Sequence, residues 1–290
     1  MSKKVIGKLK ANHDILKSWM DHMHQHPEMS MKESETAKFI AEKLREMGGW
    51  EIVEGVGKYG IVASMTVGDG HKTIGLRADF DALPITEDNE LPYKSKIEGM
   101  SHLCGHDAHT TMLLGAAKYL AETRNFNGTV RMIFQPGEET MEGAPAMIAD
   151  GLFERFPVDS VFGMHNMPGL EAGKFYFNTG EFMAAVDNWE IELTGKGSHG
   201  SMPELSIDPI VCGSSLVLAL QTIVSRNLSP WHSSVVNVGA FQSGIAGNAV
   251  PQKAILRLSI RNMKSEDRVM VLDKIRSITK SQAEAFNCGY

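Results

Sequence analysis

A short stretch of metal-binding residue types, residues 102–109 (HLCGHDAH), constrains most strongly how this chain can fold. It holds three histidines, a cysteine and an aspartate. Imidazole and thiolate groups are preferred ligands of zinc and related transition metals. Cys104 and His106 are two positions apart, so an extended or turning backbone can direct both side chains toward one cavity. A helical pattern follows at residues 110–122, so the fold has to bring further ligands to the beginning of a helix.

Further ligand types follow two predicted strands. Residues 128–135 (GTVRMIFQ) have the apolar run of a buried strand and lead into Glu138 and Glu139. Residues 160–163 predict a shorter strand that leads into His165. Because α/β proteins place their sites just beyond the carboxyl ends of strands, we expect these side chains to meet the earlier cluster of cysteine and histidines.

A pair of aspartates follows a third predicted strand, residues 73–78. Either Asp79 or Asp81 is placed to accept a hydrogen bond from a ligand histidine, which would fix the tautomer of its ring. An aspartate shortly before Pro84 also fits a turn, so we assign the functional role to Asp79 ahead of Asp81.

The adjacent glutamates predict a division of labour. In an extended backbone Glu138 and Glu139 point in roughly opposite directions, so one would bind a metal while the other stays free. The free carboxylate would act first as general base and then as general acid, because a bound metal lowers the pKa of water toward neutrality.

Three histidines alternate at residues 22–26, at the end of a helix predicted over residues 5–24. Their spacing invites a second metal site, but isolated histidines near a surface are common. We therefore favour a helix end held near the site.

The order of the predicted elements indicates two parts. Strands and helices alternate as far as about residue 179, which is typical of an α/β domain. From residue 188 the pattern is strand, helix, two strands and helix, one strand short of a ferredoxin-like unit. The remaining predicted elements of the first part are residues 32–47, 50–54 and 60–67, and those of the second part are residues 189–194, 208–226, 235–242, 254–261 and 265–286, with a glycine-rich loop at 195–207.

Composition excludes several classes of protein. The 290 residues carry a net charge of -6 and no dense run of Lys or Arg, so we expect no nucleic-acid partner. We find no apolar stretch long enough to span a bilayer and no signal-peptide core, which predicts no membrane association and a cytoplasmic location. The three cysteines are far apart and odd in number, so we expect no disulfide framework.

Five stretches together, residues 76–84, 102–109, 135–143, 163–168 and 195–203, resemble the amidohydrolases of the aminoacylase/carboxypeptidase-G metallopeptidase superfamily. The similar branch contains hippurate hydrolase, N-acyl-amino-acid deacylases and plant auxin-conjugate hydrolases. The resemblance covers essentially the whole chain, and the motifs occur in family order. It implies an α/β catalytic domain at residues 1–185, with a mixed sheet flanked by helices. It also implies an inserted ferredoxin-like α+β lid and dimerisation domain at residues 186–290.

The same resemblance implies a metal centre. The matching positions make Cys104, His106, Glu139 and His165 the metal ligands. The implied site binds divalent metal, most simply two ions. This donor set is compatible with zinc, manganese, nickel or cobalt.

Four other residues receive roles from the resemblance. Glu138 matches the general base, and Asp79 matches the motif acid behind the site. His199 matches a histidine that reaches the active site of a neighbouring subunit and steadies the tetrahedral oxyanion. Asn248 matches a lid residue that contacts substrate.

The implied activity is metal-dependent hydrolysis of N-acyl amino acids, of the hippurate or N-acetyl type, by a homodimer joined through its second domain. In the family a segment after the lid supplies a last histidine ligand, whereas this sequence stops at Tyr290, where the final lid strand should begin. We therefore expect the catalytic domain to lack its C-terminal part and the isolated polypeptide to be weakly active or inactive. Clear metal-dependent turnover by the purified chain would contradict this expectation.

Two alternatives stay open. Cys104 with His106 or His109 would make a cysteine-nucleophile amidase, although the spacing is tight and leaves Glu138 and Glu139 unexplained. An inactive or non-catalytic metal-binding dimer would keep the fold without the last ligand.

Overall fold

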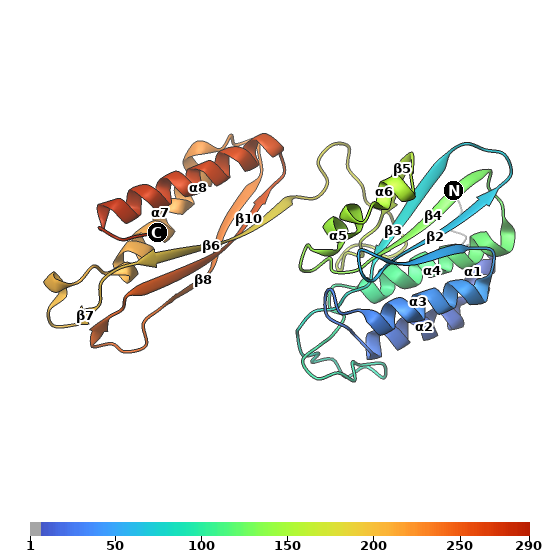
Figure 1. Ribbon diagram of the computed structural model, residues 1–290, viewed down its shortest axis with the longest axis horizontal. Helices are drawn as coiled ribbons and strands as arrows, with labels where there is room; N and C mark the ends of the chain where they lie inside the picture. The colour runs from blue at the N-terminus through green and yellow to red at the C-terminus, as the bar shows by residue number, and fades with distance from the viewer. Residues whose placement is uncertain (1–6) are drawn as a thin grey trace. The chain divides into compact units, whose positions relative to one another are not determined.

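The strand predicted at residues 128–135 lies at the centre of a mixed five-stranded sheet (Figure 1). This strand, β4 (Gly128–Gln135), pairs antiparallel with β2 (Gly60–Val67) and parallel with β3 (Thr73–Asp79). Outside these lie β1 (Glu51–Val56), antiparallel to β2, and β5 (Ser160–Gly163), parallel to β3. The order β1-β2-β4-β3-β5 confirms the expected mixed sheet.

Both faces of this sheet are covered, because side chains alternate along each strand. On β2, Ile61 and Ala63 join the core beneath α2 (His13–Gln25), α3 (Ser34–Met47) and α4 (His106–Thr123). Val62 points to the other face and packs with residues of the short helices α5 (Gly143–Ala149) and α6 (Leu152–Arg155). The result is the expected α/β arrangement of a sheet flanked by helices.

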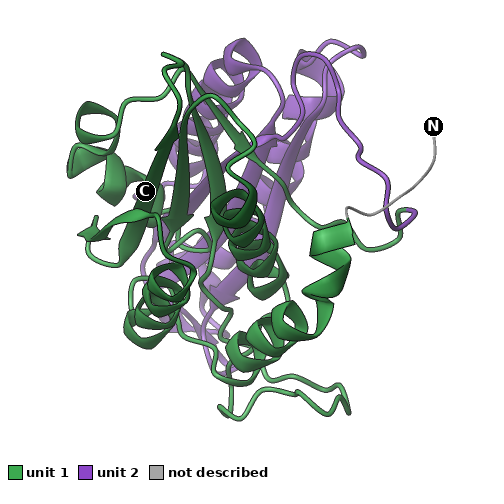
Figure 2. Ribbon diagram, turned by 90° about the vertical axis from the view of Figure 1, so that its right-hand side faces the viewer, with its two compact units in different colours: residues 1–170 green, residues 171–290 purple. Residues whose placement is uncertain are grey.

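The structure is a computed structural model that describes residues 7–290. They divide into two compact units, residues 7–170 and 171–290, which are distinguished by colour in Figure 2. The sequence pattern changes about 15 residues later than this division, at the predicted boundary of 185 and 186.

The second unit is a three-stranded antiparallel sheet with two helices. Its strands β6 (Ala185–Thr194), β10 (Lys253–Asn262) and β8 (Ser234–Ser243) lie in that order. Alternate residues of β10 form one core with α7 (Pro209–Asn227) and α8 (Ser265–Ala285). The predicted order of strand, helix, two strands and helix is confirmed, with β7 (Ser198–His199), η1 (Pro203–Leu205) and β9 (Ala249–Val250) as additions.

Several predicted boundaries shift. The helix expected at residues 5–24 is two helices, α1 (Gly7–Ala11) and α2, and its first residues lie outside the described part. The helix expected at 110–122 begins four residues earlier, at His106, so the second half of the 102–109 stretch is itself helical.

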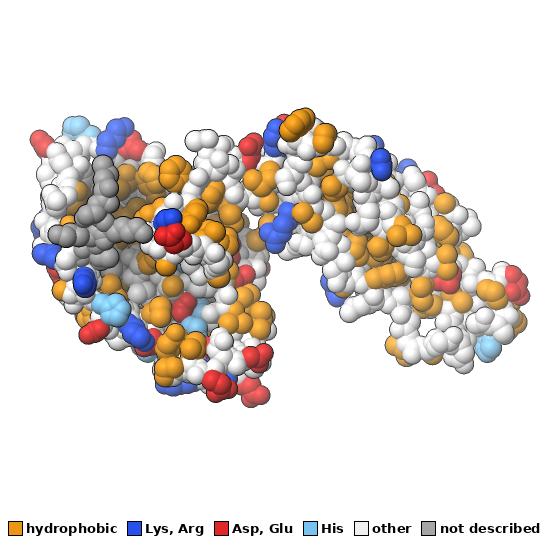
Figure 3. Space-filling model, turned by 180° about the vertical axis from the view of Figure 1, so that it is seen from behind, with side chains coloured by type: hydrophobic (Ala, Val, Ile, Leu, Met, Phe, Trp, Pro, Cys, Tyr) orange, Lys and Arg blue, Asp and Glu red, His pale blue; other side chains and the backbone are white. Residues whose placement is uncertain are grey.

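Strand β5 is exposed along its whole length, because it pairs on one side only. The segment that follows also exposes apolar side chains, and hydrophobic atoms are visible on the surface of each unit in Figure 3. The most exposed large apolar side chains of this segment are Phe175, Phe177 and Met183.

Helix α7 corrects the expectation that no stretch is long and apolar enough to span a bilayer. Its 19 residues, with mean hydropathy 1.3, meet that length and composition. Helix α7 is apolar because it packs in the core of the second unit, where Cys212, Leu216, Leu220 and Ile223 are buried. A helix in the core of a water-exposed domain can have the same length and hydropathy as a membrane-spanning helix.

Two leucines on α7 test this packing. Leu220 is fully buried and Leu218 is 73% exposed. We expect Leu220→Ala to lower the free energy of unfolding by about 2–5 kcal/mol, because it opens a cavity in the core. The matched Leu218→Ala should change it by less than about 0.5 kcal/mol. Urea unfolding measures both, and equal losses would show that α7 does not pack as described.

Candidate metal centre

Three parallel strands bring the predicted site residues to one edge of the sheet. Strands β4, β3 and β5 run in the same direction, so their carboxyl ends lie side by side. Glu138 and Glu139 follow β4, Asp81 follows β3, and His165 follows β5. Helix α4 starts at the same edge with His106. The sheet topology therefore gathers residues that are up to 84 positions apart in sequence.

The four predicted ligands are brought together. The Nε2 atom of His106 lies 3.8 Å from Oε1 of Glu139 and 3.9 Å from Oε2 of Glu138. The Sγ atom of Cys104 lies 3.4 Å from Nε2 of His165. Ligand atoms of Cys104, His106 and His165 are within 4.8 Å of one another, as are those of His106 and the two glutamates. His106 is common to both groups.

Hydrogen bonds orient both histidines with Nε2 toward the cluster. The Nδ1 atom of His106 donates to the backbone oxygen of Asp81 at 2.9 Å and lies 3.1 Å from its carboxylate. The Nδ1 atom of His165 donates to the backbone oxygen of Asn166 at 2.6 Å. An oxygen acceptor on one ring nitrogen leaves the other as a lone-pair donor, which is how ligating histidines are held.

Two buried atoms in the cluster have no hydrogen-bond partner among residues 7–290. They are Nε2 of His106 and Oε1 of Glu139. Buried polar atoms without partners are costly, and a divalent ion between an imidazole and a carboxylate satisfies both. The donor set of thiolate, imidazole and carboxylate also suits transition metals. These residues therefore fit a metal centre.

The two aspartates that follow β3 make different contacts near the centre. Asp81 is the residue that orients His106, and its other oxygen accepts hydrogen bonds from Ser30 Oγ at 2.7 Å and Glu139 N at 2.9 Å. Burial opposes its ionisation, but these hydrogen bonds lower the pKa of Asp81 below its ordinary value. The structure shows Asp81 hydrogen-bonded to His106 and Asp79 hydrogen-bonded to His109, so the role assigned to Asp79 stays a prediction. The two aspartates have the same chemistry and lie two residues apart, so only their contacts distinguish them.

Asp79 makes its hydrogen bonds to other residues, although its Oδ2 atom lies 3.7 Å from Nε2 of His106. It is bound by Arg77 at 2.8 Å and by Nδ1 of His109 at 2.7 Å. Burial opposes its ionisation, yet these partners hold the pKa of Asp79 well below its usual range. Nε2 of His109 lies 2.7 Å from Oδ1 of Asn166. Because both ring nitrogens of His109 are engaged, the neighbouring group of Asp79, His106 and His109 is a poorer metal site.

The adjacent glutamates occupy a turn and not the extended segment that we expected. Both carboxylates lie within 4 Å of the same atom, Nε2 of His106. The Pro-Gly pair before them is a turn signal that agrees with this conformation. Burial raises the pKa of Glu138 above its ordinary value, which suits a group that takes up and returns a proton near neutral pH.

The pKa values of Cys104 and His106 are both raised by the negatively charged carboxylates around them. Burial and the nearby carboxylates, Glu139 above all, raise the pKa of Cys104 to about 12. Burial alone would lower the pKa of His106, but Asp81 and Asp79 raise it to about 9. A thiol with a raised pKa is the opposite of an activated nucleophile. This counts against the cysteine-nucleophile alternative.

Gly105 allows the two sides of the centre to meet. Its φ of 90° is in the left-handed region, directly before α4. A Cβ atom at this position would lie 2.4 Å from the side chain of Asn166, beside His165. A side chain at residue 105 would therefore push the His165 segment away from Cys104.

A buried ionic group behind the centre was missed by sequence analysis. His24, from α2, lies with Nδ1 2.8 Å from Asp107 and Nε2 3.2 Å from Glu87. The hydrogen bond to Asp107 is the main cause that raises the pKa of His24. His24 thus links α2, the first turn of α4 and the 85–100 loop. Of the three alternating histidines, His24 makes these contacts, whereas the Nδ1 atom of His26 bonds to the backbone oxygen of His22.

His199 and Asn248 lie together in the second unit. His199 pairs with Ala249 between β7 and β9, and Gly200 N donates to the backbone oxygen of Asn248 at 2.8 Å. The ring of His199 is exposed and contacts Ser201 Oγ at 2.7 Å. Their assigned roles stay predictions.

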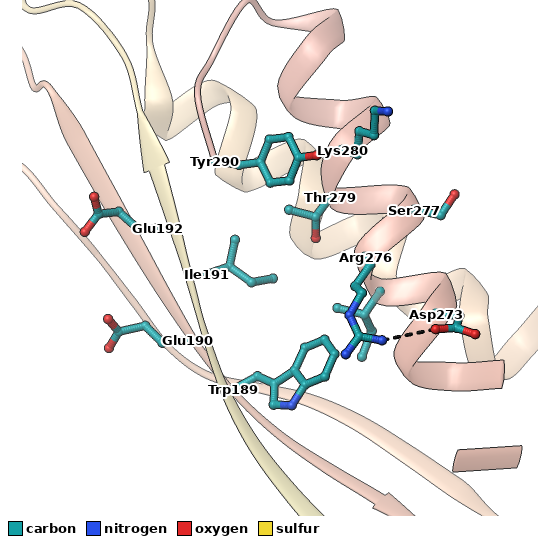
Figure 4. A pocket seen from close by; sticks show the side chains of 11 residues that line it. Trp189, Glu190, Ile191, Glu192, Asp273, Arg276, Ser277, Thr279, Lys280 and Tyr290 are labelled. Carbon is teal, nitrogen blue, oxygen red and sulfur yellow. Dashed lines mark hydrogen bonds and ion pairs between the residues drawn. The ribbon is translucent and has the colours of Figure 1, made fainter. Parts of the chain in front are cut away.

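A cavity of about 590 Å³ lies in the second unit, away from these residues (Figure 4). It runs between β6 and α8, where Arg276 stacks over Trp189 at 4.6 Å. Its lining contains no group of three metal-ligand side chains and no paired nucleophile and base among the described residues. The chemistry is therefore better sought at the Cys104–His165 cluster.

Comparison with known proteins agrees with this geometry. The sequence model of "Peptidase family M20/M25/M40" matches residues 75–275. Hippurate hydrolase of Campylobacter jejuni is 51% identical over 263 residues, which cover 91% of this chain and 68% of that protein. N-acetyl-L-cysteine deacetylase of Bacillus subtilis is 41% identical over 267 residues, covering 92% of this chain and 64% of that protein. The chain thus spans about two thirds of the length of these curated relatives.

A solved structure shows the same likeness. The YXEP protein of Bacillus subtilis, described as a dinuclear metal-binding peptidase of the M20 family, aligns with a TM-score of 0.78 and 34% identity. The alignment covers 96% of this chain and 72% of that chain.

The His24 group predicts a pH dependence of stability. Because the pKa of His24 is higher in the folded chain than in the unfolded chain, protonation of His24 contributes to the free energy of unfolding. This contribution is fully present below the unfolded pKa of about 6.5 and is lost as pH rises through the folded pKa. We expect His24→Gln to cost about 3 kcal/mol near pH 6, because it leaves two carboxylates without their cation, and less at alkaline pH. Denaturant unfolding of the metal-free chain at several pH values measures this. His13→Gln, at an exposed histidine, is the control, and a pH-independent loss at His24 would contradict the ionic role.

Proposed function

Because this chain belongs to the peptidase family M20/M25/M40 and is a metal-dependent amidohydrolase, we propose that it hydrolyses N-acyl amino acids to a carboxylate and a free amino acid. The observation that carries the proposal is the joint position of a thiol, two imidazole Nε2 atoms and Glu139, with Glu138 beside them. The names of the two curated relatives support acyl groups of the benzoyl and acetyl type.

We propose Cys104, His106, Glu139 and His165 as the residues that hold the metal. The likeness to a dinuclear peptidase supports two ions, and the donor set suits zinc, manganese, nickel or cobalt. When bound, a divalent ion would polarise the amide carbonyl and acidify the attacking water. Asp81 and the backbone oxygen of Asn166 keep the two imidazoles in the ligating tautomer.

Glu138 is the proposed general base. Its carboxylate is 43% exposed, so water reaches it, and Oε2 lies 3.9 Å from the Nε2 atom of His106. Its raised pKa lets it take a proton from the attacking water and return it to the leaving amine. His199, from a partner subunit, would steady the oxyanion, and Asn248 would contact the substrate. Asp79 would act indirectly, by holding His109 beside the centre.

Removing Glu138 tests the division between ligand and base. We expect Glu138→Gln to lower kcat by about 10²–10⁴-fold on hippurate and N-acetyl amino acids, because proton transfer is lost. Metal content, measured by elemental analysis, should stay at the wild-type value. Glu142→Gln, an exposed glutamate at the end of the same turn, is the matched control and should keep activity.

Chelation separates the proposal from the cysteine-nucleophile alternative. A chelator should abolish hydrolysis, and added divalent metal should restore it. Activity that is indifferent to chelator but lost on alkylation of Cys104 would overturn the metal mechanism. Retention of metal without turnover of any substrate in the panel would favour a non-catalytic binding protein.

We further propose a cytoplasmic homodimer that pairs through the second unit. Strand β8 is at one end of its sheet, and no strand of residues 7–290 pairs with its outer edge. An open strand edge favours pairing with the same strand of a second copy around a two-fold axis. Sedimentation should give the mass of a dimer, and Val235→Pro, which places a proline in β8, should give monomers. A wild-type monomer at high concentration would contradict the proposal.

A further inference from the structure

Glu33 is a fully buried carboxyl outside the proposed ligand set. It stands at the residue before α3, and none of its surface is exposed. Its Oε1 atom accepts hydrogen bonds from the backbone N–H of Met31 at 2.9 Å and of Gly137 at 2.7 Å. Burying a carboxyl is costly, so these contacts indicate a specific role at this position.

The bond to Gly137 joins Glu33 to the turn that carries the two glutamates of the centre. Gly137 has a φ of 54°, and its carbonyl oxygen accepts from Glu142 N at 3.2 Å and Gly143 N at 3.0 Å. A Cβ atom on Gly137 would lie 2.7 Å from Sδ of Met31. The turn is therefore packed directly against the Met31–Glu33 segment.

That segment is itself held in an unfavourable conformation. Met31 has a φ of 60°, which residues with a side chain rarely adopt. Its N–H is bound by Glu33, and its carbonyl oxygen accepts from Nζ of Lys58 at 2.9 Å. Such strain persists where surrounding contacts hold it in place, and it is concentrated around functional sites.

A second buried carboxylate holds the other end of the same turn. Oδ2 of Asp81 accepts from the backbone N–H of Glu139 at 2.9 Å. The backbone N–H groups of the residues before and after Glu138 are thus both fixed, that of Gly137 by Glu33 and that of Glu139 by Asp81. Asp81 also orients His106, so the turn and the ligand imidazole share one support.

We propose that Glu33 is a positioning residue of the metal centre, which holds the 137–139 turn so that Glu139 reaches the metal and Glu138 reaches the water. The inference rests on the proposed function. The important group is the oxygen acceptor of Glu33 and not its charge. Burial raises the pKa of Glu33, and its Oε2 atom has no hydrogen-bond partner within the described part of the chain.

Titration of the metal-free chain with Co²⁺ tests this without relying on turnover. Binding is followed by the thiolate-to-cobalt absorption of Cys104. We expect Glu33→Leu to weaken Co²⁺ binding about 10–100-fold, the usual loss when a residue that supports a ligand is removed. Glu33→Asp keeps the charge but is one methylene too short to reach Gly137, so it should weaken binding in the same direction. Glu33→Gln keeps the acceptor and should bind close to the wild-type affinity.

Glu28→Ala is the matched control. The Glu28 carboxylate accepts from Thr36 N and Thr36 Oγ1, both at 2.7 Å, and so stabilises the beginning of the same helix α3. It makes no side-chain contact with the 137–139 turn among the described hydrogen bonds. This variant should lower Tm but leave Co²⁺ affinity unchanged, which separates positioning from helix stability.

The outcomes distinguish the two proposals. A wild-type chain that binds no Co²⁺ would overturn the proposed metal centre itself. Wild-type binding that Glu33→Leu and Glu33→Asp both retain would overturn the role of Glu33 alone. So would a loss in Glu33→Gln as large as that in Glu33→Asp, because the acceptor would then not be the important feature. If Glu33→Leu does not fold, as judged by circular dichroism, the comparison of Asp with Gln decides the question.

Discussion

The parallel pairing of β3 with β4 and β5 is the constraint on which the rest of the centre depends. It sets the carboxyl ends of three strands at one edge of the sheet, so that Asp81, Glu139 and His165 arrive there from separate parts of the chain. Helix α4 can then add His106 to the same place, because it packs on the face of that sheet. Without the common strand direction, these groups would have no reason to converge.

Backbone hydrogen bonds then convert proximity into a defined geometry. The histidines are fixed through Nδ1 by oxygen acceptors, and the glutamate turn is fixed through the N–H groups of Gly137 and Glu139. Asp81 supports both His106 and the N–H of Glu139, whereas Asn166 and Glu33 supply the other two supports from separate parts of the chain. Side chains held in this way are already oriented before a ligand binds, which lowers the cost of assembling a site.

Sequence analysis found the elements and the ligand types, but not the supporting contacts. Strands such as residues 60–67 and 128–135 are rich in β-branched and other apolar residues, and the candidate ligands that follow residues 128–135 can be read from the order of the chain. By contrast, the contact of Glu33 with Gly137 spans 104 residues, and that of His24 with Asp107 spans 83. No local pattern encodes such pairs. Asp79 and Asp81 have the same chemistry and lie two residues apart, so only the structure distinguishes them.

The charges around the centre explain why a cation belongs there. The carboxylate of Asp79 is balanced by Arg77, which it contacts at 2.8 Å, and that of Asp81 is bound by His106. Within residues 7–290, Glu138 and Glu139 form no ion pair with Lys or Arg and share the imidazole of His106 with the aspartates. Their negative field contributes to the rise in the pKa of Cys104 to about 12. A divalent ion would reverse that effect, because it stabilises a coordinated thiolate and binds a carboxylate at the same time. The feature that makes Cys104 a poor nucleophile in the metal-free chain is therefore the feature that favours it as a ligand.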